Sequence, residues 1–297
     1  MKQAYPVLTL VSCAICVVVF IGLLNEPNAS SWEALAKWGC YPPDKIHAGA
    51  LWGFITSTFV HLELWHVAFN LYWLYVLVSR LERVIGSGRW LAFFLGAAFV
   101  SSGAEFAVAG TTGIGASGVA YALFGFMWVT RRRHPTFGAV LDARTIGLFF
   151  LWLVGCLIMT LTKTWEVGNA AHVAGLFFGA GLGAWMICER RRRLIKLGLA
   201  ALFLMSIVPV FWAPWSFDWA SWRGTRAYER GDYRSAIRWY ERSSSLGQDK
   251  IWCWQSIAIA YYAMGDQTHY ERTLQLLRNL DEKAAKKVEA DVRPEKK

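Results

Sequence analysis

The chain has 297 residues and a formal net charge of +10, and 55% of its residues are hydrophobic, including 17 Trp and 18 Phe. A large globular protein can share this composition, but the apolar residues here fall in long runs, which favours a membrane protein over a soluble domain. The positive charge gives no reason to expect a nucleic-acid partner, because most of it lies in short segments that flank the apolar runs.

Seven apolar runs approach the length that a helix needs to cross a hydrocarbon core about 30 Å thick. In chain order they are Val7 to Leu24, Leu62 to Val78, Trp90 to Val108, Ile114 to Val129, Ile146 to Leu161, Asn169 to Cys188 and Leu194 to Trp212. The sequence therefore predicts an all-α, polytopic membrane helix bundle. A secretory signal peptide competes for the first run, but that run is longer than a usual signal core, so we interpret it as an uncleaved span.

Basic residues in short loops predict the orientation, since such loops stay mainly in the cytoplasm. One predicted side carries thirteen Lys and Arg, from Lys2 to Lys196, and the other carries Lys37, Lys45 and Lys163. This places the amino terminus in the cytoplasm, and seven spans place the carboxyl tail outside. We expect a multi-pass protein of a cell membrane, the inner membrane of a bacterium.

The six cysteines show no metal-ligand spacing, and four of them lie in predicted spans, where they are interpreted as apolar filler. Cys40 and Cys253 would both face an oxidising compartment. A disulfide between these two is the open alternative.

The fourth run is short and begins with a glycine-rich segment that contains Ser117. About 16 residues, or roughly 24 Å of helix, separate Gly115 from the first arginine after the run, Arg131. If the arginines mark one membrane face, the helix begins below the other face and Ser117 is submerged. Non-helical backbone is tolerated at that depth only beside protein or a water-filled cavity, so this segment indicates a site.

Other polar side chains are predicted at a similar depth. Counted from the nearest basic boundary, His66 and Ser117 both stand about 21 Å into the membrane, and His172 stands at roughly 27 Å. Asn70 lies on the same helix face as His66, one turn deeper. Three predicted spans thus contribute polar groups to one level.

Simpler interpretations exist for each of these residues. Small residues in apolar spans allow close helix packing, which two sets match: Gly118, Ala122 and Gly125 on the fourth run, and Gly175, Gly179 and Gly183 on the sixth. A buried histidine can also belong to an ion pathway. A transporter would need a chain of paired acids, which the spans lack, and Glu63 and Glu105 are expected to face water near the outer ends.

The combination of these residues favours nucleophilic catalysis. A serine hydroxyl is a poor nucleophile until a base takes its proton, and neutral imidazole is the usual base near neutral pH. Ser117 and His172 supply such a pair if the glycines let their helices approach closely. The fourth helix begins at the serine, so its unpaired N–H groups can stabilise a developing oxyanion.

Three stretches together are similar to the rhomboid intramembrane serine proteases. They are His61-Leu-Glu-Leu-Trp-His66-Val-Ala-Phe-Asn70, Gly115-Ala-Ser117-Gly-Val-Ala-Tyr121 and Ala171-His172-Val-Ala-Gly175-Leu-Phe-Phe-Gly179, on the second, fourth and sixth spans. The similarity covers residues 52–189 and implies a six-helix core. The extra helix at 194–212 resembles the six-plus-one arrangement of some members.

The resemblance implies a catalytic dyad, with Ser117 as nucleophile and His172 as base, and with no acidic third member, cofactor or metal. It also implies an oxyanion hole formed by His66, Asn70 and the backbone of the segment from Gly115 to the serine.

Two further positions bear on the resemblance. Tyr121 matches the aromatic that packs on the catalytic imidazole in this family, although an ordinary packing tyrosine fits the sequence equally well. The family's Trp-Arg pair in the first external loop corresponds to Trp52-Gly53 here, which leaves the rigidity of that loop open.

The polar tail that follows the transmembrane domain (residues 1–215) has a repeat. Gly231-Asp232 recurs 34 residues later as Gly265-Asp266, within similar surroundings of Ala and Tyr. This period resembles tetratricopeptide helical hairpins, so residues 216–281 are expected to form a small helical, tetratricopeptide-like tail that binds a protein or peptide partner. A plain amphipathic helical tail is the alternative. Residues 282–297 are expected to be disordered.

These observations predict an intramembrane serine endopeptidase that cleaves transmembrane segments of membrane proteins within the lipid bilayer. The alternative is a catalytically inactive rhomboid-like protein that binds or escorts membrane clients. Retention of both Ser117 and His172 favours the enzyme.

Overall fold

The computed structural model describes residues 6–292, so Lys2 and the last five residues of the tail lie outside the described part. These residues form helices and no strand. The chain divides after Pro209 into two compact units, called unit 1 (up to Pro209) and unit 2 (from Val210).

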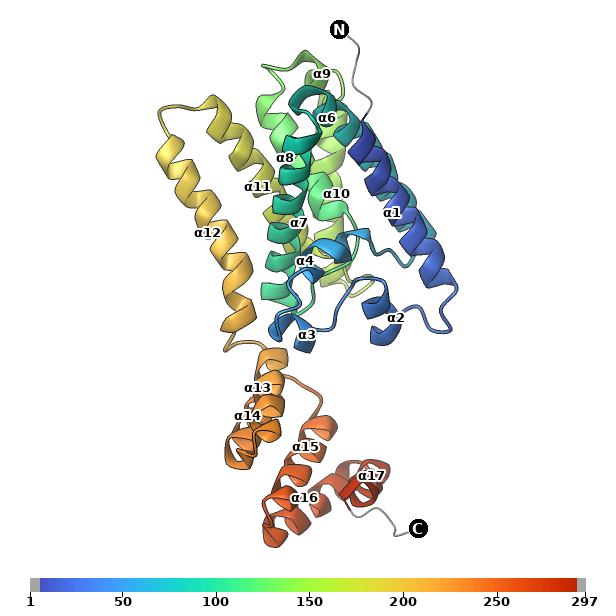
Figure 1. Ribbon diagram of the computed structural model, residues 1–297, viewed down its shortest axis with the longest axis vertical. Helices are drawn as coiled ribbons and strands as arrows, with labels where there is room; N and C mark the ends of the chain where they lie inside the picture. The colour runs from blue at the N-terminus through green and yellow to red at the C-terminus, as the bar shows by residue number, and fades with distance from the viewer. Residues whose placement is uncertain (1–5, 293–297) are drawn as a thin grey trace. The chain divides into compact units, whose positions relative to one another are not determined.

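Unit 1 contains the long apolar helices, which run side by side in Figure 1. Its elements are α1 (Val7–Leu24), α2 (Trp32–Lys37), α3 (Pro43–His47), α4 (Gly53–Thr56), η1 (Ser57–Phe59), α5 (Leu64–Trp73), η2 (Leu74–Val78), α6 (Ser79–Ile85), α7 (Ser87–Ala109), α8 (Ser117–Thr130), α9 (Pro135–Gly138), α10 (Ala143–Leu161), α11 (Asn169–Ile187) and most of α12 (Arg192–Phe211).

Five of the described helices are long and apolar enough to cross a membrane, namely α1, α7, α10, α11 and α12. The second predicted span is instead built from two consecutive segments, α5 and the π-helical turn η2, and α6 continues beyond its predicted end. The fourth, α8, has only 14 residues. The helix that carries the candidate serine is thus shorter than the five long helices, as the short fourth run predicts.

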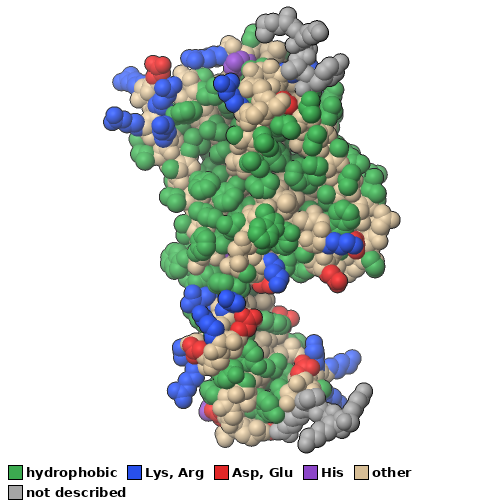
Figure 2. Space-filling view, viewed as in Figure 1, with side chains coloured by type: hydrophobic (Ala, Val, Ile, Leu, Met, Phe, Trp, Pro, Cys, Tyr) green, Lys and Arg blue, Asp and Glu red, His purple; other side chains and the backbone are tan. Residues whose placement is uncertain are grey.

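Unit 1 presents an apolar surface around its sides. Large apolar side chains are exposed along α1, α10 and α12, among them Val18, Leu151 and Leu197, each more than 60% exposed. Figure 2 shows hydrophobic side chains over this surface, with Lys and Arg gathered at the end of unit 1 that is drawn uppermost. Such a surface is stable only where lipid replaces water, because burying apolar area is what drives folding in water.

Helices α8 and α11 make the most extensive contact of any two described helices. A Cβ added at Gly175 would overlap Gly118 O, and one added at Gly179 would overlap Ala122 O. The small residues predicted to allow close packing therefore face one another, with backbone against backbone. Close approach of this kind increases van der Waals contact between helices, which matters most where there is no hydrophobic driving force.

The start of α1 is held by the carboxylate of Glu82 on α6. Oε1 accepts the Leu8 N–H at 3.1 Å, and Oε2 accepts the Thr9 N–H at 2.9 Å and the Thr9 hydroxyl at 2.6 Å. Ser87 at the start of α7 donates to Oε1 at 2.7 Å. One buried carboxylate thus satisfies unpaired donors of a helix start and joins three helices.

Unit 2 continues with five helices, α13 (Phe217–Glu229), α14 (Tyr233–Ser245), α15 (Lys250–Ala263), α16 (Gln267–Leu280) and α17 (Glu282–Val292). The first four form two antiparallel pairs. Asp232 caps α14 by accepting the Ser235 N–H, and Asp266 caps α16 by accepting the His269 N–H. Hydrogen bonds from Ser235 and His269 lower the pKa of these two carboxyls. The 34-residue period therefore repeats the same cap.

The structure differs from one expectation for the tail and answers the open alternative for the cysteines. Disorder is expected from Glu282, but residues 282–292 form α17, whose Ala284, Ala285 and Val288 are buried against α15 and α16. Because these three lie on one face of the helix, the charged composition belongs to the opposite face. Cys40 and Cys253 are free thiols, each buried in the core of its own unit, so no disulfide joins them.

The α8–α11 contact predicts a difference between two glycine substitutions. Gly179→Ala should lower the thermal unfolding midpoint in detergent, because its Cβ meets a backbone oxygen that cannot move aside, and overpacking typically costs about 1–3 kcal/mol. Gly155→Ala on α10 is the matched control, since no atom lies within 4 Å of its Cβ position. We expect this control to leave the midpoint unchanged or raised. Equal midpoints for both variants would contradict the packing described here.

Candidate active site

The two residues predicted as a dyad are in hydrogen-bond contact. The Nε2 atom of His172 lies 2.8 Å from Ser117 Oγ, although the residues are 55 positions apart in the chain. Ser117 is the first residue of α8, and His172 lies in the first turn of α11. The close packing of these helices is what makes the contact, because both side chains project from the same end of the α8–α11 pair.

The segment before Ser117 is shaped by glycines. Gly113 and Gly115 have φ angles of +66° and +96°, in the left-handed region that favours glycine. The Gly115 N–H donates to Ser57 O at 3.1 Å, which ties the segment to η1. Within residues 6–292 no side chain caps the first turn of α8, so N–H groups of this turn remain open beside the serine.

The imidazole of His172 is packed on one side by Tyr121. Their ring centroids are 4.8 Å apart and the planes are inclined by 34°. The Tyr121 hydroxyl donates to Phe149 O on α10 at 2.9 Å, which fixes the phenol ring. His172 is 3% exposed, and among the described residues its Nδ1 has no hydrogen-bond partner. No carboxylate therefore orients this ring, and packing performs that task.

His66 approaches the backbone in front of Ser117. A Cβ added at Gly115 would stand 2.7 Å from His66 Nε2, so only glycine leaves room for this imidazole. Nδ1 of His66 is 3.8 Å from a carboxylate oxygen of Glu63, whose side chain is 44% exposed. The structure thus places the His66 imidazole against Gly115, two residues before Ser117.

Asn70 lies one turn further along α5 and is buried, with 2% of its surface exposed. Its Nδ2 donates to His66 O at 2.9 Å within the same helix. An amide has two N–H donors, and this hydrogen bond uses one of them.

Two residues at the site were not assigned a role from sequence. His61 is fully buried, with Nδ1 3.1 Å from Phe59 O and Nε2 accepting the Ala116 N–H at 3.4 Å. This arrangement requires the tautomer with the proton on Nδ1. The position of His61 at the start of the second-span motif was the signal available in the sequence.

The second is Glu105, and the expectation that it faces water is wrong. Glu105 is 7% exposed, and its Oε2 accepts the Ala171 N–H at 3.0 Å. It lies near the end of α7, where an exposed charge is usual. Only the contact with α11, which is distant in sequence, explains its burial.

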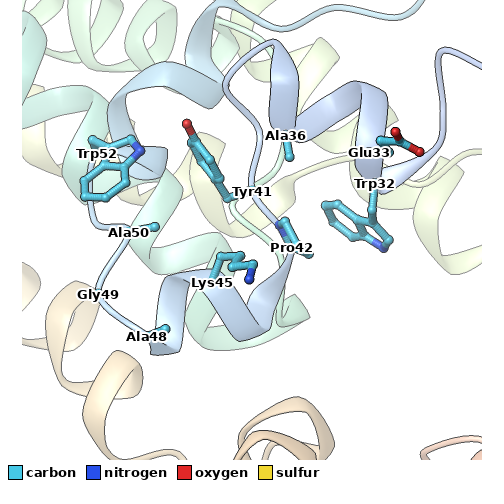
Figure 3. Close-up of a pocket in the computed structure, with 10 residues that line it drawn as sticks. All are labelled: Trp32, Glu33, Ala36, Tyr41, Pro42, Lys45, Ala48, Gly49, Ala50 and Trp52. Atoms are coloured by element: carbon cyan, nitrogen blue, oxygen red, sulfur yellow. The ribbon is translucent and has the colours of Figure 1, made fainter.

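One groove lies away from the dyad, in the loop region between α1 and α5. It encloses about 770 Å³ and is lined by residues of α2, α3 and the adjoining loops, including Trp32, Tyr41 and Trp52 (Figure 3). A Cβ at Gly53 would stand 2.7 Å from Ile46 Cδ1. The resemblance stated above implies an arginine at this position. A side chain there has no room unless Ile46 moves.

Comparisons with known proteins cover the same region. Residues 48–190 match the family model described as Rhomboid domain. The chain is 34% identical over 180 residues to the rhomboid protease GlpG of Serratia proteamaculans, covering 60% of this chain and 62% of that protein. It is 31% identical over 184 residues to the protein of the same name from Yersinia enterocolitica, covering 62% and 64%.

The chain spans less than two thirds of the length of these curated relatives. The matched region nevertheless contains every residue of the site described above, from His61 in the loop before α5 to His172 on α11. By its domain and by its relatives, this region of the chain belongs to the rhomboid family.

Proposed function

We propose that this chain is an intramembrane serine protease that cleaves transmembrane segments of membrane proteins with a Ser117–His172 dyad. The observation that carries the proposal is the 2.8 Å contact between His172 Nε2 and Ser117 Oγ. A base within hydrogen-bond reach of a hydroxyl is the first requirement of an activated serine. The names of the relatives support the same activity.

Acylation begins when Ser117 Oγ attacks the scissile carbonyl carbon while its proton passes to His172 Nε2. The tetrahedral intermediate carries a negative oxygen. When it collapses, the C–N bond breaks and His172 returns the proton to the departing amine. The product is an ester between Ser117 and the amino-terminal part of the substrate.

Deacylation repeats these steps with water in place of the amine. His172 takes a proton from water, the hydroxide attacks the ester carbonyl, and the serine leaves with the proton that His172 returns. No metal or cofactor takes part in the proposal.

The oxyanion is proposed to bind the open N–H groups at the start of α8, together with His66 and Asn70. The proposed oxyanion would lie at the end of a helix whose dipole is positive there. Gly115 contributes by allowing His66 to come this close to the serine. Tyr121 contributes by fixing the His172 ring.

The proposed substrates are membrane-spanning helices that unwind locally. A helical carbonyl is hydrogen-bonded to the N–H four residues later, and the backbone shields it from attack. Segments rich in small or helix-breaking residues unwind at the lowest cost, so we infer that they are preferred.

An inactive protein that binds or escorts membrane clients is not favoured. Such a protein has no need for a base aligned with a serine hydroxyl. The relatives that the chain resembles are named proteases.

We further propose that α12 is a seventh transmembrane helix and that the tail is a tetratricopeptide-like module outside the cytoplasm. The basic residues from Arg190 to Lys196 precede the apolar part of α12, which by the positive-inside rule anchors that end in the cytoplasm. The paired helices of the tail are of a kind that binds peptides or partner proteins, so the tail is proposed to select or present substrates.

Removal of either dyad member should abolish cleavage. Ser117→Ala and His172→Ala should each reduce turnover of a model transmembrane substrate by roughly 10⁴-fold or more, and the double variant should be little worse, because the two residues act as a unit. Labelling by a fluorophosphonate should disappear in Ser117→Ala. Full cleavage by Ser117→Ala in a protein of unchanged helicity would rule out the proposed nucleophile.

Loss of an oxyanion donor should slow turnover more than it weakens binding. Asn70→Ala should lower kcat by about 10²–10³-fold with a small change in KM, because the donor acts on the charge that develops in the transition state. Parallel losses in kcat and in substrate affinity would assign Asn70 a packing role instead.

The tail should be dispensable for chemistry. A chain truncated after Trp215 should still cleave a generic substrate but lose activity on a native client.

The orientation of the tail is testable with Gln248→Cys, which should react with a membrane-impermeant thiol reagent in intact cells. Cys253 is fully buried and should not react. Labelling of the variant only after permeabilisation would place the tail in the cytoplasm.

A further inference from the structure

The helix that carries His172 begins without a cap from its own segment. Gly168, the residue before α11, has no side chain to accept the free N–H groups of the first turn. The carboxylate of Glu105 on α7 takes this place. Its Oε2 accepts the Ala171 N–H at 3.0 Å, and the Ala170 N–H also points to the carboxylate.

Glu105 contacts both segments that lead into the dyad. A Cβ at Gly168 would stand 3.3 Å from Glu105 Oε2, and a Cβ at Gly113 would stand 3.3 Å from Glu105 Cγ. Gly113 lies four residues before Ser117, and Gly168 lies four residues before His172. Within residues 6–292 no Lys or Arg forms an ion pair with Glu105. The carboxylate is therefore held by backbone donors and by the positive end of a helix.

The first turn of α11 sets the position of the base. His172 directly follows Ala171, and its own N–H donates to Gly168 O at 3.1 Å. If the Ala171 N–H loses its acceptor, this turn can fray and the imidazole can move away from Ser117 Oγ. A displacement of about 1 Å can cost roughly 10²-fold in rate.

We propose that Glu105 is a positioning residue that caps the first turn of α11 and thereby keeps His172 Nε2 in register with Ser117 Oγ. This inference rests on the proposed protease function. Glu105 acts through the backbone, because its oxygens bond to amide groups, whereas His172 Nδ1 has no hydrogen-bond partner among the described side chains. Glu105 is thus not the acid of a catalytic triad.

Three substitutions of Glu105 separate the effects of its side-chain length, its charge and its packing. Glu105→Gln keeps an acceptor oxygen at the same distance but removes the charge. Glu105→Asp keeps the charge but withdraws the oxygen by about one bond length, roughly 1.5 Å. Glu105→Ala removes both. The matched control is Glu166→Ala, an exposed glutamate two residues before Gly168.

We expect Glu105→Ala and Glu105→Asp to lower kcat for a model substrate by about 10²-fold with little change in KM. Glu105→Gln should remain within roughly tenfold of the wild type, since a neutral hydrogen bond replaces a charge-assisted one. Glu166→Ala should not differ from the wild type. If Gln is as damaging as Ala while Asp is tolerated, the charge and not the cap is what matters, and the proposal is wrong.

Hydrogen exchange tests the cap without relying on activity. Peptides that contain residues 169–172 should exchange faster in Glu105→Ala and Glu105→Asp than in the wild type, Glu105→Gln and Glu166→Ala. Unchanged exchange in both the Ala and Asp variants overturns the proposal. If Glu105→Ala does not fold, the Asp and Gln pair decides. A wild-type protein that neither cleaves nor reacts with a fluorophosphonate refutes the protease function, while the exchange result still decides the cap.

Discussion

Helices α8 and α11 approach each other so closely that carbonyl oxygens of one lie where side chains of the other would normally stand. The rest of the site depends on this approach. Ser117 and His172 each lie in the first turn of a helix. Their side chains meet because the two helices lie close together. Glycines at 175 and 179 permit this, and the close contact also gives the pair its rigidity. The glycines that allow close packing and the proposed Ser117–His172 dyad therefore belong to the same helix–helix contact. The packing interpretation of the glycines and the catalytic interpretation of the serine do not compete.

The starts of α8 and α11 differ in whether their backbone N–H groups have acceptors. The start of α11 is closed by the carboxylate of Glu105, which accepts backbone N–H groups there. The start of α8 has no side-chain cap, so its donors stay open toward the serine. An unsatisfied N–H in an apolar environment costs free energy, and that cost is returned when a negative oxygen binds. In the proposed mechanism, the helix that holds the base has its donors satisfied, whereas the helix that receives the oxyanion keeps them free.

Much of this arrangement was predictable because it depends on residue type and periodicity. The short fourth run, the three motif stretches and the facing glycines all follow from spacing along single helices, and the structure places Ser117 and His172 in hydrogen-bond contact. What could not be predicted depends on contacts between distant segments. Glu105 lies near a helix end, where sequence favours exposure, and only the position of α11 shows that it is buried. The charged residues of α17 hide an apolar face of three small residues, which composition alone does not reveal. The second span is broken by a π-helical turn at 74–78, for which the run of apolar residues carries no signal.

The carboxylate of Glu82, which joins the starts of α1 and α7, has a consequence for the order in which the protein can be built. The groups it binds are Leu8, Thr9 and Ser87, and all of them are synthesised before the serine of α8. Domains assemble from the amino terminus during synthesis, so the three helices that this carboxylate joins can close before either half of the dyad exists. The last part of the site to arrive is His172, more than 80 residues after Ser87. In a nascent chain, α1, α6 and α7 can therefore pack together before α11 is inserted, and Ser117 has no histidine partner until then.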